Sequence, residues 1–319
     1  MSRLILAAVD PYRGDGEPVA LGALLARATG APLLIVGVYP DATTGLSLGA
    51  VERDRAARQH AMEGLELILQ GLGARPDEIH GAPYELDALP GRSPTRALHE
   101  LAERKDAAIL VVGSTHRGPV GRIVPGSITE RVVHGSPCPV AVAPRGFDDA
   151  KRVLTRIGVA YAGTPEGELA LLSAVALARR AKAKMLAYTL IDPVLYSQGT
   201  VGVDGYWTYP PTEADQQELW RRAEIADQKL KSRLGQAAAG LDAEAVVIAD
   251  GMVDSLVEET SDIDLLCCGS RGYGPLSAVL LGGVTHTLML KAACPLLLIP
   301  RGARNALTEL LAAETATHA

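Results

Sequence analysis

Val112-Gly113-Ser114-Thr115-His116 opens a stretch that closes at Pro144-Arg145-Gly146, and the chain repeats it from Cys268-Gly269-Ser270-Arg271-Gly272 to Pro300-Arg301-Gly302. The second copy follows the first at a constant offset of 156 residues, from Gly113 to Gly269. A glycine-spaced stretch kept in register through two half-chains indicates one duplicated structural unit. Glycine loops of this kind commonly hold phosphate or ribose, so the two loops are the first candidates for a binding site.

The length of the chain agrees with a duplication. Its 319 residues exceed the usual size of a single domain and provide two units, each large enough to bury its own core. We expect a first domain at residues 1–147, a second at residues 151–303 and a tail at residues 304–319. Hydrophobic residues at 48% and charged residues at 21% are typical of a folded globular protein.

Charge and hydropathy exclude two classes of partner. The net charge is −6 and no basic run is present, which argues against nucleic acid. No stretch approaches the roughly 20 apolar residues that span a bilayer, and the region around Leu4–Val9 lacks the features of a signal peptide. We therefore expect a cytoplasmic protein without membrane or nucleic-acid partners.

The four cysteines fit the same compartment. Cys138 and Cys294 occupy equivalent places before the last strand of each half, and Cys267 and Cys268 are neighbours in an apolar run. Adjacent strand residues face opposite ways, which disfavours a disulfide between them. No CxxC or paired-histidine spacing is present, so we interpret the cysteines as buried apolar residues and assign no metal ligands.

Short apolar runs alternate with amphipathic helical patterns in both halves. Strands are expected at Leu4–Val9, Leu33–Val38, Ile79–Glu85, Ile109–Val112, Val140–Ala143, Ile157–Tyr161, Met185–Ile191, Ala245–Ala249, Leu265–Cys268 and Leu296–Ile299. Helices are expected at Val19–Thr29, Glu52–Leu72, Thr95–Arg104, Ile128–Val133, Glu166–Lys182, Glu213–Ala239, Asp254–Thr260 and Val284–Lys291. This order predicts an α/β fold with two doubly wound parallel sheets, which bind ligands beyond the carboxyl ends of their strands.

One loop distinguishes the halves. The first half has a short Gly/Thr/Ser stretch at residues 43–49, whereas the second half has a longer loop at Tyr196–Pro211 that contains four aromatic residues. In a chain with only 4% aromatic residues, this loop is either a ligand lid or a packing and oligomer-contact surface. The residues leave both alternatives open.

The two glycine loops have matching spacings. The first reads Gly113-x-x-His116, nine residues, Gly126-Ser127, and the second reads Gly269-x-x-Gly272, nine residues, Gly282-Gly283. Each loop follows a predicted strand and opens a predicted helix, where backbone amides face an anion and a missing Cβ permits close approach.

At these residues the chain resembles the universal stress protein family, in its tandem two-domain (actinobacterial-type) members, over essentially the whole chain. The family motif is Gly, two residues, Gly, nine residues, Gly and then Ser or Thr, and many members use it to hold the ribose and phosphates of ATP. The resemblance implies that Asp10 and Val38 contact adenine, with Ala162 and Leu190 at the corresponding positions of the second half.

The resemblance also implies an architecture. Each half would contain a five-stranded parallel sheet in the order 3-2-1-4-5, with helices on both faces. The last strands, Val140–Ala143 and Leu296–Ile299, would pair across a pseudo-twofold axis and protect each other's edges. The chain would then be an intrachain pseudo-dimer, and a further homodimer remains open.

The implied ligand is ATP, or AMP or ADP, with or without magnesium. The candidate binding residues are Asp10, Val38, Gly113, His116, Gly126, Ser127, Gly269, Gly272, Gly282 and Gly283. The chain departs from the motif where His116 replaces a glycine, where Gly283 replaces Ser or Thr, and where Ala162 replaces the acidic residue. Because Asp10, Gly113, Gly126 and Ser127 all remain in the first half, we expect that half to be the better nucleotide site.

From the residues alone, other roles are open. Asp10 is equally suited to a turn or a helix cap, and Ser127 and Thr129 are equally suited to capping the helix that they begin. The chain contains neither a GxxxxGK[ST] loop nor a GxSxG elbow, so no catalytic residue is assigned. The expected function is a non-catalytic, adenine-nucleotide-responsive stress regulator that acts on an unidentified protein partner. The alternatives are a slow ATP hydrolase and a scaffold that binds no nucleotide.

Overall fold

Strands and helices alternate along both halves of the chain. The first half contains β1 (Ile5–Val9), α1 (Glu17–Thr29), β2 (Leu33–Tyr39), α2 (Ala50–Gly71), β3 (Glu78–Ile79), β4 (Ala82–Pro90), α3 (Pro94–Arg104), β5 (Ile109–Gly113), α4 (Ser127–Val133) and β6 (Val140–Ala143). The second half contains β7 (Arg156–Ala160), α5 (Pro165–Ala181), β8 (Lys184–Leu190), α6 (Glu213–Ala237), β9 (Ala243–Ile248), α7 (Val253–Glu259), the 3-10 helix η2 (Thr260–Asp262), β10 (Leu265–Gly269), α8 (Gly283–Lys291) and β11 (Leu296–Ile299).

These elements come from a computed structural model of the chain. The structure describes residues 3–41, 49–114, 120–123, 126–147, 152–191, 213–249, 252–270, 283–303 and 307. The aromatic loop Tyr196–Pro211 and most of the tail lie outside the described residues, so the alternatives for that loop stay open.

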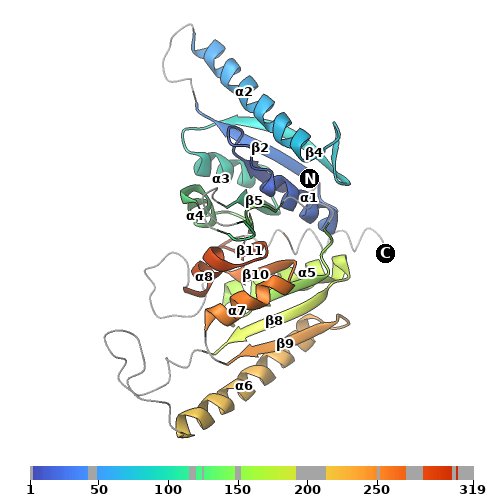
Figure 1. Cartoon of the computed structure of the whole chain (residues 1–319), viewed down its shortest axis with the longest axis vertical. Coiled ribbons are helices and arrows are strands. Elements are labelled where there is room, and N and C mark those ends of the chain that lie inside the picture. Colours follow the sequence, from blue (N-terminus) through green and yellow to red (C-terminus); the bar gives the residue numbers. More distant parts are fainter. Residues whose placement is uncertain are drawn as a thin grey trace, which may run out of the picture.

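The eleven strands of the described residues form one sheet in the order β3-β4-β2-β1-β5-β6-β11-β10-β7-β8-β9 (Figure 1). Without the short β3, each half has the predicted order 3-2-1-4-5 with parallel neighbours. The halves meet where β6 and β11 run antiparallel, with Leu297 opposite Ala141. The predicted edge pairing is therefore confirmed, and Figure 1 shows α2 and α6 at the two far ends of the elongated molecule.

The third predicted strand was placed too early. Sequence reasoning puts it at Ile79–Glu85, whereas the strand that joins the main sheet is Ala82–Pro90. His80 and Gly81 have φ values of 50° and 90°, and this left-handed turn folds β3 back on β4 as a short hairpin. The other predicted helices and strands agree with the observed bounds to within two residues at each end.

Helices cover both faces of the sheet. The side chains of α1, α2, α5 and α6 pack on one face, and those of α3, α4, α7 and α8 pack on the other. Each of these two apolar layers contains residues from both halves, and α1 packs against α5. Burial of apolar surface therefore continues across the junction between β6 and β11 and stabilises the two halves as one body.

The four cysteines are buried free thiols. Burial raises the pKa of Cys138 to about 11 and that of Cys268 to about 12, so both remain protonated at neutral pH. They act as small apolar core residues, as the sequence predicts. In the described ranges, no group of three or more His, Cys, Asp or Glu side chains is placed to hold a metal ion.

None of the helices in the described part of the chain combines the length and apolar character that a membrane span requires.

Candidate functional site

A cavity of about 710 Å³ lies at the carboxyl ends of the strands in the first half. Its walls come from the segments that follow β1, β2, β4 and β5 and from the first turn of α4. The lining residues are Ala8, Val9, Asp10, Tyr12, Arg13, Asp15, Pro18, Val38, Pro40, Asp41, Gly91, Arg92, Pro94, Leu98, Val112, Gly113, Ser114, Gly126, Ser127, Ile128 and Thr129. The volume falls within the range of about 300–1,000 Å³ that is usual for small-molecule sites.

The cavity brings together the predicted residues of the first half that the structure describes. Asp10, Val38, Gly113, Gly126 and Ser127 all line it, although they come from four separate segments of the chain. Parallel strands end at one edge of the sheet, which explains how residues so far apart in sequence converge there.

The remaining predicted residues are either outside the described residues or in the second half. His116, Gly272 and Gly282 lie outside the described residues. Gly269 ends β10 and Gly283 begins α8, at the equivalent edge of the second half.

The carboxylate of Asp10 holds the loop that follows β1. Its Oδ1 accepts a hydrogen bond from the backbone N–H of Tyr12 at 3.0 Å, and its Oδ2 lies 3.4 Å from Nε of Arg13. This is the turn role that the residues alone left open. Contact with adenine stays a proposal for this side chain.

Several lining residues were missed by sequence reasoning. Tyr12, Arg13 and Asp15 follow β1, and Asp41 follows β2 and lies 3.7 Å from Nε of Arg92, beyond β4. Each lies in a segment that follows a carboxyl strand end, which is the signal that could have found them. The early placement of the third strand concealed Arg92, because the strand that precedes it ends at Pro90.

Hydrogen bonds fix the start of each glycine loop in the same way. Thr129 Oγ1 donates to the carbonyl of Gly113 at 2.7 Å, and Thr285 Oγ1 donates to that of Gly269 at 2.8 Å. The next amide in each loop donates to the last strand of its half, from Ser114 to Ala143 at 3.1 Å and from Ser270 to Ile299 at 2.9 Å. The duplicated unit therefore conserves a lock between strand, loop and helix, which we call the threonine lock.

The helix-capping alternative for Ser127 and Thr129 is wrong. The N-cap of α4 is Gly126, and no side chain caps this helix. Thr129 serves the threonine lock instead, and the hydroxyl of Ser127 accepts a hydrogen bond from Nη2 of Arg131 at 3.1 Å.

Gly113 and Gly269 are needed where a helix approaches the strand end. A Cβ on Gly113 would lie 3.1 Å from Cγ of Pro18 in α1. A Cβ on Gly269 would lie 2.9 Å from Cβ of Glu166 and 3.0 Å from the backbone nitrogen of Gly167, in the first turn of α5. The missing side chain thus permits close packing of helix on strand at both positions.

In the second half, a helical turn and an ion pair occupy the region where the first half has the loop that lines the cavity. Ile5 pairs with Ile109, and Ile157 pairs with Leu265, the counterpart of Ile109 in the second half. Ile157 is therefore equivalent to Ile5, and Ala162 is equivalent to Asp10. Here the helix begins at Pro165, so that Glu166 covers the strand end.

The ion pair joins α5 to α6. Nη2 of Arg233 lies 2.7 Å from Oε2 of Glu168, and the hydroxyl of Tyr161 donates to Oε1 at 2.6 Å. Hydrogen bonds from Arg233 and Tyr161 hold the pKa of Glu168 below its usual value, and burial and Glu168 raise the pKa of Tyr161 to about 12. In the first half the side chain of Leu72 lies next to the corresponding position, Gly16, where an added Cβ would be 2.9 Å from Cδ2 of Leu72.

Comparison with known proteins agrees with this geometry. The model of the universal stress protein family matches residues 1–144 and again residues 154–300. The chain belongs to the universal stress protein family. A universal stress protein of Mycobacterium tuberculosis (strain ATCC 25618 / H37Rv) is 27% identical over 306 residues, which cover 92% of this chain and 95% of that protein. One from Mycolicibacterium smegmatis is 37% identical over 118 residues, which cover 29% of this chain and 91% of that protein.

Solved structures show the same universal stress protein fold. A universal stress protein of Archaeoglobus fulgidus DSM 4304 matches with a TM-score of 0.58 at 15% identity. The match covers 95% of this chain and 100% of the Archaeoglobus chain. Two further universal stress protein structures are in complex with cAMP and with dAMP. They cover 46% and 44% of this chain at TM-scores of 0.29 and 0.30, so their ligands are properties of those proteins alone.

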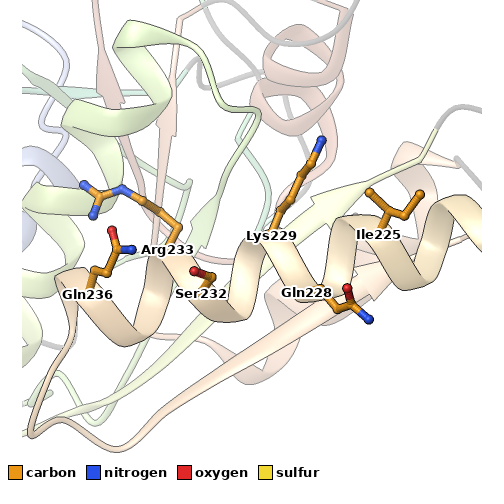
Figure 2. Close-up of a pocket in the computed structure, with 6 residues that line it drawn as sticks. All are labelled: Ile225, Gln228, Lys229, Ser232, Arg233 and Gln236. Atoms are coloured by element: carbon orange, nitrogen blue, oxygen red, sulfur yellow. The ribbon is translucent and has the colours of Figure 1, made fainter.

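A second hollow of this universal stress protein lies on α6. It has a volume of about 410 Å³, and its lining residues are Ile225, Gln228, Lys229, Ser232, Arg233 and Gln236. Figure 2 shows Gln228 and Lys229 pointing to opposite sides of the helix. These residues belong to a single helix, and Arg233 is held by Glu168, so we assign the hollow no ligand.

Proposed function

We propose that this universal stress protein binds an adenine nucleotide in the cavity of its first half and acts as a regulator without dedicated catalysis. One observation carries the proposal. The resemblance to the family assigns Asp10, Val38, Gly113, Gly126 and Ser127 to a nucleotide site, and these residues line one cavity of about 710 Å³.

The chemistry of the cavity supports this class of ligand. Aliphatic surface from Val38, Pro40 and Leu98 suits a flat base, whereas the glycine loop contributes the small polar residues Ser114 and Ser127. Small-molecule sites usually combine such apolar walls with a few polar groups that fix orientation. Which adenine nucleotide binds, with or without magnesium, is part of the proposal that experiment must decide.

The proposed output is a ligand-dependent change in contacts to a regulatory protein. The buried, protonated thiols agree with the reducing cytoplasm that the sequence predicts.

Thermal unfolding tests the proposal. The protein is heated with AMP, ADP, ATP or cAMP, each with and without magnesium, because family members in complex with cAMP and dAMP make adenine nucleotides the first ligands to try. A ligand at 100 times its Kd stabilises the native state by about 2.7 kcal/mol. The absence of a shift with every nucleotide at millimolar concentration contradicts the proposal.

Two matched glycine variants test which half binds. The backbone of Gly126 is extended, at φ −80° and ψ 165°, which a valine also adopts, so Gly126→Val adds bulk beside the cavity without backbone strain. Gly283→Val is the control at the second loop, because a Cβ there meets no atom within 4 Å. We expect Gly126→Val to remove the nucleotide-dependent shift and Gly283→Val to retain it. Phosphate release from ATP that Gly126→Val abolishes would favour the hydrolase alternative.

A further inference from the structure

Tyr12 stands at the cavity with nearly half of its surface in solvent. It lines the cavity, and its side chain is 47% exposed. An aromatic ring gains free energy when it is buried, and it stacks favourably on other flat rings. Only 4% of this chain is aromatic, so a ring at the cavity is a specific feature of its surface.

The position of Tyr12 is fixed on two sides. Asp10 Oδ1 accepts its backbone N–H at 3.0 Å. The ring of His60, from α2, stacks on the tyrosine ring with centroids 5.6 Å apart and an interplanar angle of 29°. The ring is therefore held in place without a ligand, which lowers the entropic cost of binding one.

Helix α2 packs closely against the loop that carries Tyr12. A Cβ on Gly64 of α2 would lie only 2.0 Å from the carbonyl oxygen of Pro11. This close approach of helix to loop exists because position 64 has no side chain, and it brings His60, one turn earlier in α2, next to Tyr12.

The second half has no equivalent ring. By the same strand register, Thr164 is the residue equivalent to Tyr12. Its hydroxyl caps α5 by accepting a hydrogen bond from the N–H of Gly167 at 3.0 Å. At this position, therefore, the half that retains Asp10 carries an aromatic ring and the other half carries a threonine.

We propose that Tyr12 is the base-stacking residue of the cavity, and that Asp10 is a positioning residue that acts through it. The inference rests on the proposed function and deepens it: the recognised part of the ligand is a planar aromatic base, bound against a tyrosine whose other neighbour is His60. Loss of an aromatic side chain that stacks on a base weakens binding by roughly one to two orders of magnitude.

Calorimetric titration with AMP tests the proposal. We expect Tyr12→Leu to weaken AMP binding about tenfold, because the stack is lost, and Tyr12→Phe to change it less than about twofold. Ribose 5-phosphate, which has no base, should bind wild type and Tyr12→Leu equally. Tyr84→Leu is the matched control, because Tyr84 does not line the cavity and its hydroxyl donates to the carbonyl of Arg75.

The outcomes separate the two proposals. If wild type binds AMP and Tyr12→Leu binds it equally well, the stacking role is overturned while the proposed function stands. If wild type binds neither AMP nor any other adenine nucleotide, both are overturned.

A fluorescent base tests the positioning role of Asp10. The monophosphate of 2-aminopurine riboside loses fluorescence when its base stacks, so saturated wild type should quench it. Asp10→Asn keeps an oxygen that accepts the Tyr12 N–H and should quench equally, whereas Asp10→Ala at saturation should not. Full quenching by Asp10→Ala would show that Tyr12 does not depend on Asp10.

Discussion

The first and second halves share the threonine lock and differ in the segment between the first strand and the first helix. In the first half, residues 10–16 form a loop around the cavity before α1 begins at Glu17. In the second half, α5 already begins at Pro165, and its first turn packs on Gly269. The comparison teaches that duplication has preserved the parts that hold the sheet and loop together, while the segment that shapes a binding site has diverged.

The largest expected effect concerns the loop that only the first half has. We expect Gly64→Ala to destabilise the protein by about 3 kcal/mol, because its Cβ would lie 2.0 Å from the backbone oxygen of Pro11. Gly71→Ala is the control in the same helix, since a Cβ there meets nothing within 4 Å, and it should cause no loss and a gain of at most about 1 kcal/mol. Urea denaturation measures both. Equal stabilities would show that α2 does not support the loop.

The next effect compares the two strand-end glycines. Gly269→Ala should cost about 2 kcal/mol, because its Cβ meets backbone atoms of Glu166 and Gly167 that cannot rotate away. Gly113→Ala should cost about 1 kcal/mol, because its neighbour is the ring of Pro18. Chemical denaturation of both variants gives the difference. A larger cost at Gly113 would contradict the expectation that the contact at Gly269 is the less adaptable of the two.

The threonine lock should contribute equally to the free energy of unfolding in both halves. Thr129→Val and Thr285→Val keep the side-chain shape but leave the carbonyl of Gly113 or Gly269 without its hydroxyl donor. A loss of about 1–2 kcal/mol is expected for each, and the double variant should lose the sum because the sites are far apart. A loss in one half only would mean that the lock is not a shared element of the fold.

The smallest effect depends on pH. The pKa of Glu168 is lowered by hydrogen bonds from Arg233 and Tyr161, so the ionised carboxylate stabilises the fold above the unfolded pKa of about 4.3. This contribution is lost as the pH falls through the lower folded-state pKa. Because the pair is about 30% exposed, we expect Glu168→Gln to cost at most about 1 kcal/mol at pH 7. The difference from wild type should shrink below pH 4 in denaturation curves, and a constant difference down to pH 2 would assign the cost to packing.

The duplicated pattern made most of the fold predictable from the sequence. The strands Val140–Ala143 and Leu296–Ile299 have the predicted bounds, since short apolar runs between Pro residues leave little freedom in where a strand begins or ends. The strand Ala82–Pro90 was misplaced because its alternating, half-exposed residues give a weak signal, and because the turn at His80 and Gly81 needs backbone angles that no sequence pattern announces.

The site was only partly predictable. The spacing motif identifies the glycines and Ser127, and the family resemblance adds Asp10 and Val38 by their positions in the first two strands. Neither could find Tyr12 or Arg92, because these belong to the site through the three-dimensional meeting of strand ends. For Thr129 the sequence offers helix capping or ligand binding, and its hydrogen bond to Gly113 is not predictable because it joins residues 16 apart in the chain.

The antiparallel contact between β6 and β11 joins two copies of one unit within a single polypeptide. In an assembly of identical chains, every substitution falls on both subunits at once. Here each copy is encoded separately, so one can specialise in ligand binding while the other specialises in stabilising the fold. Their one-to-one stoichiometry is guaranteed by the covalent link and survives any dilution of the protein.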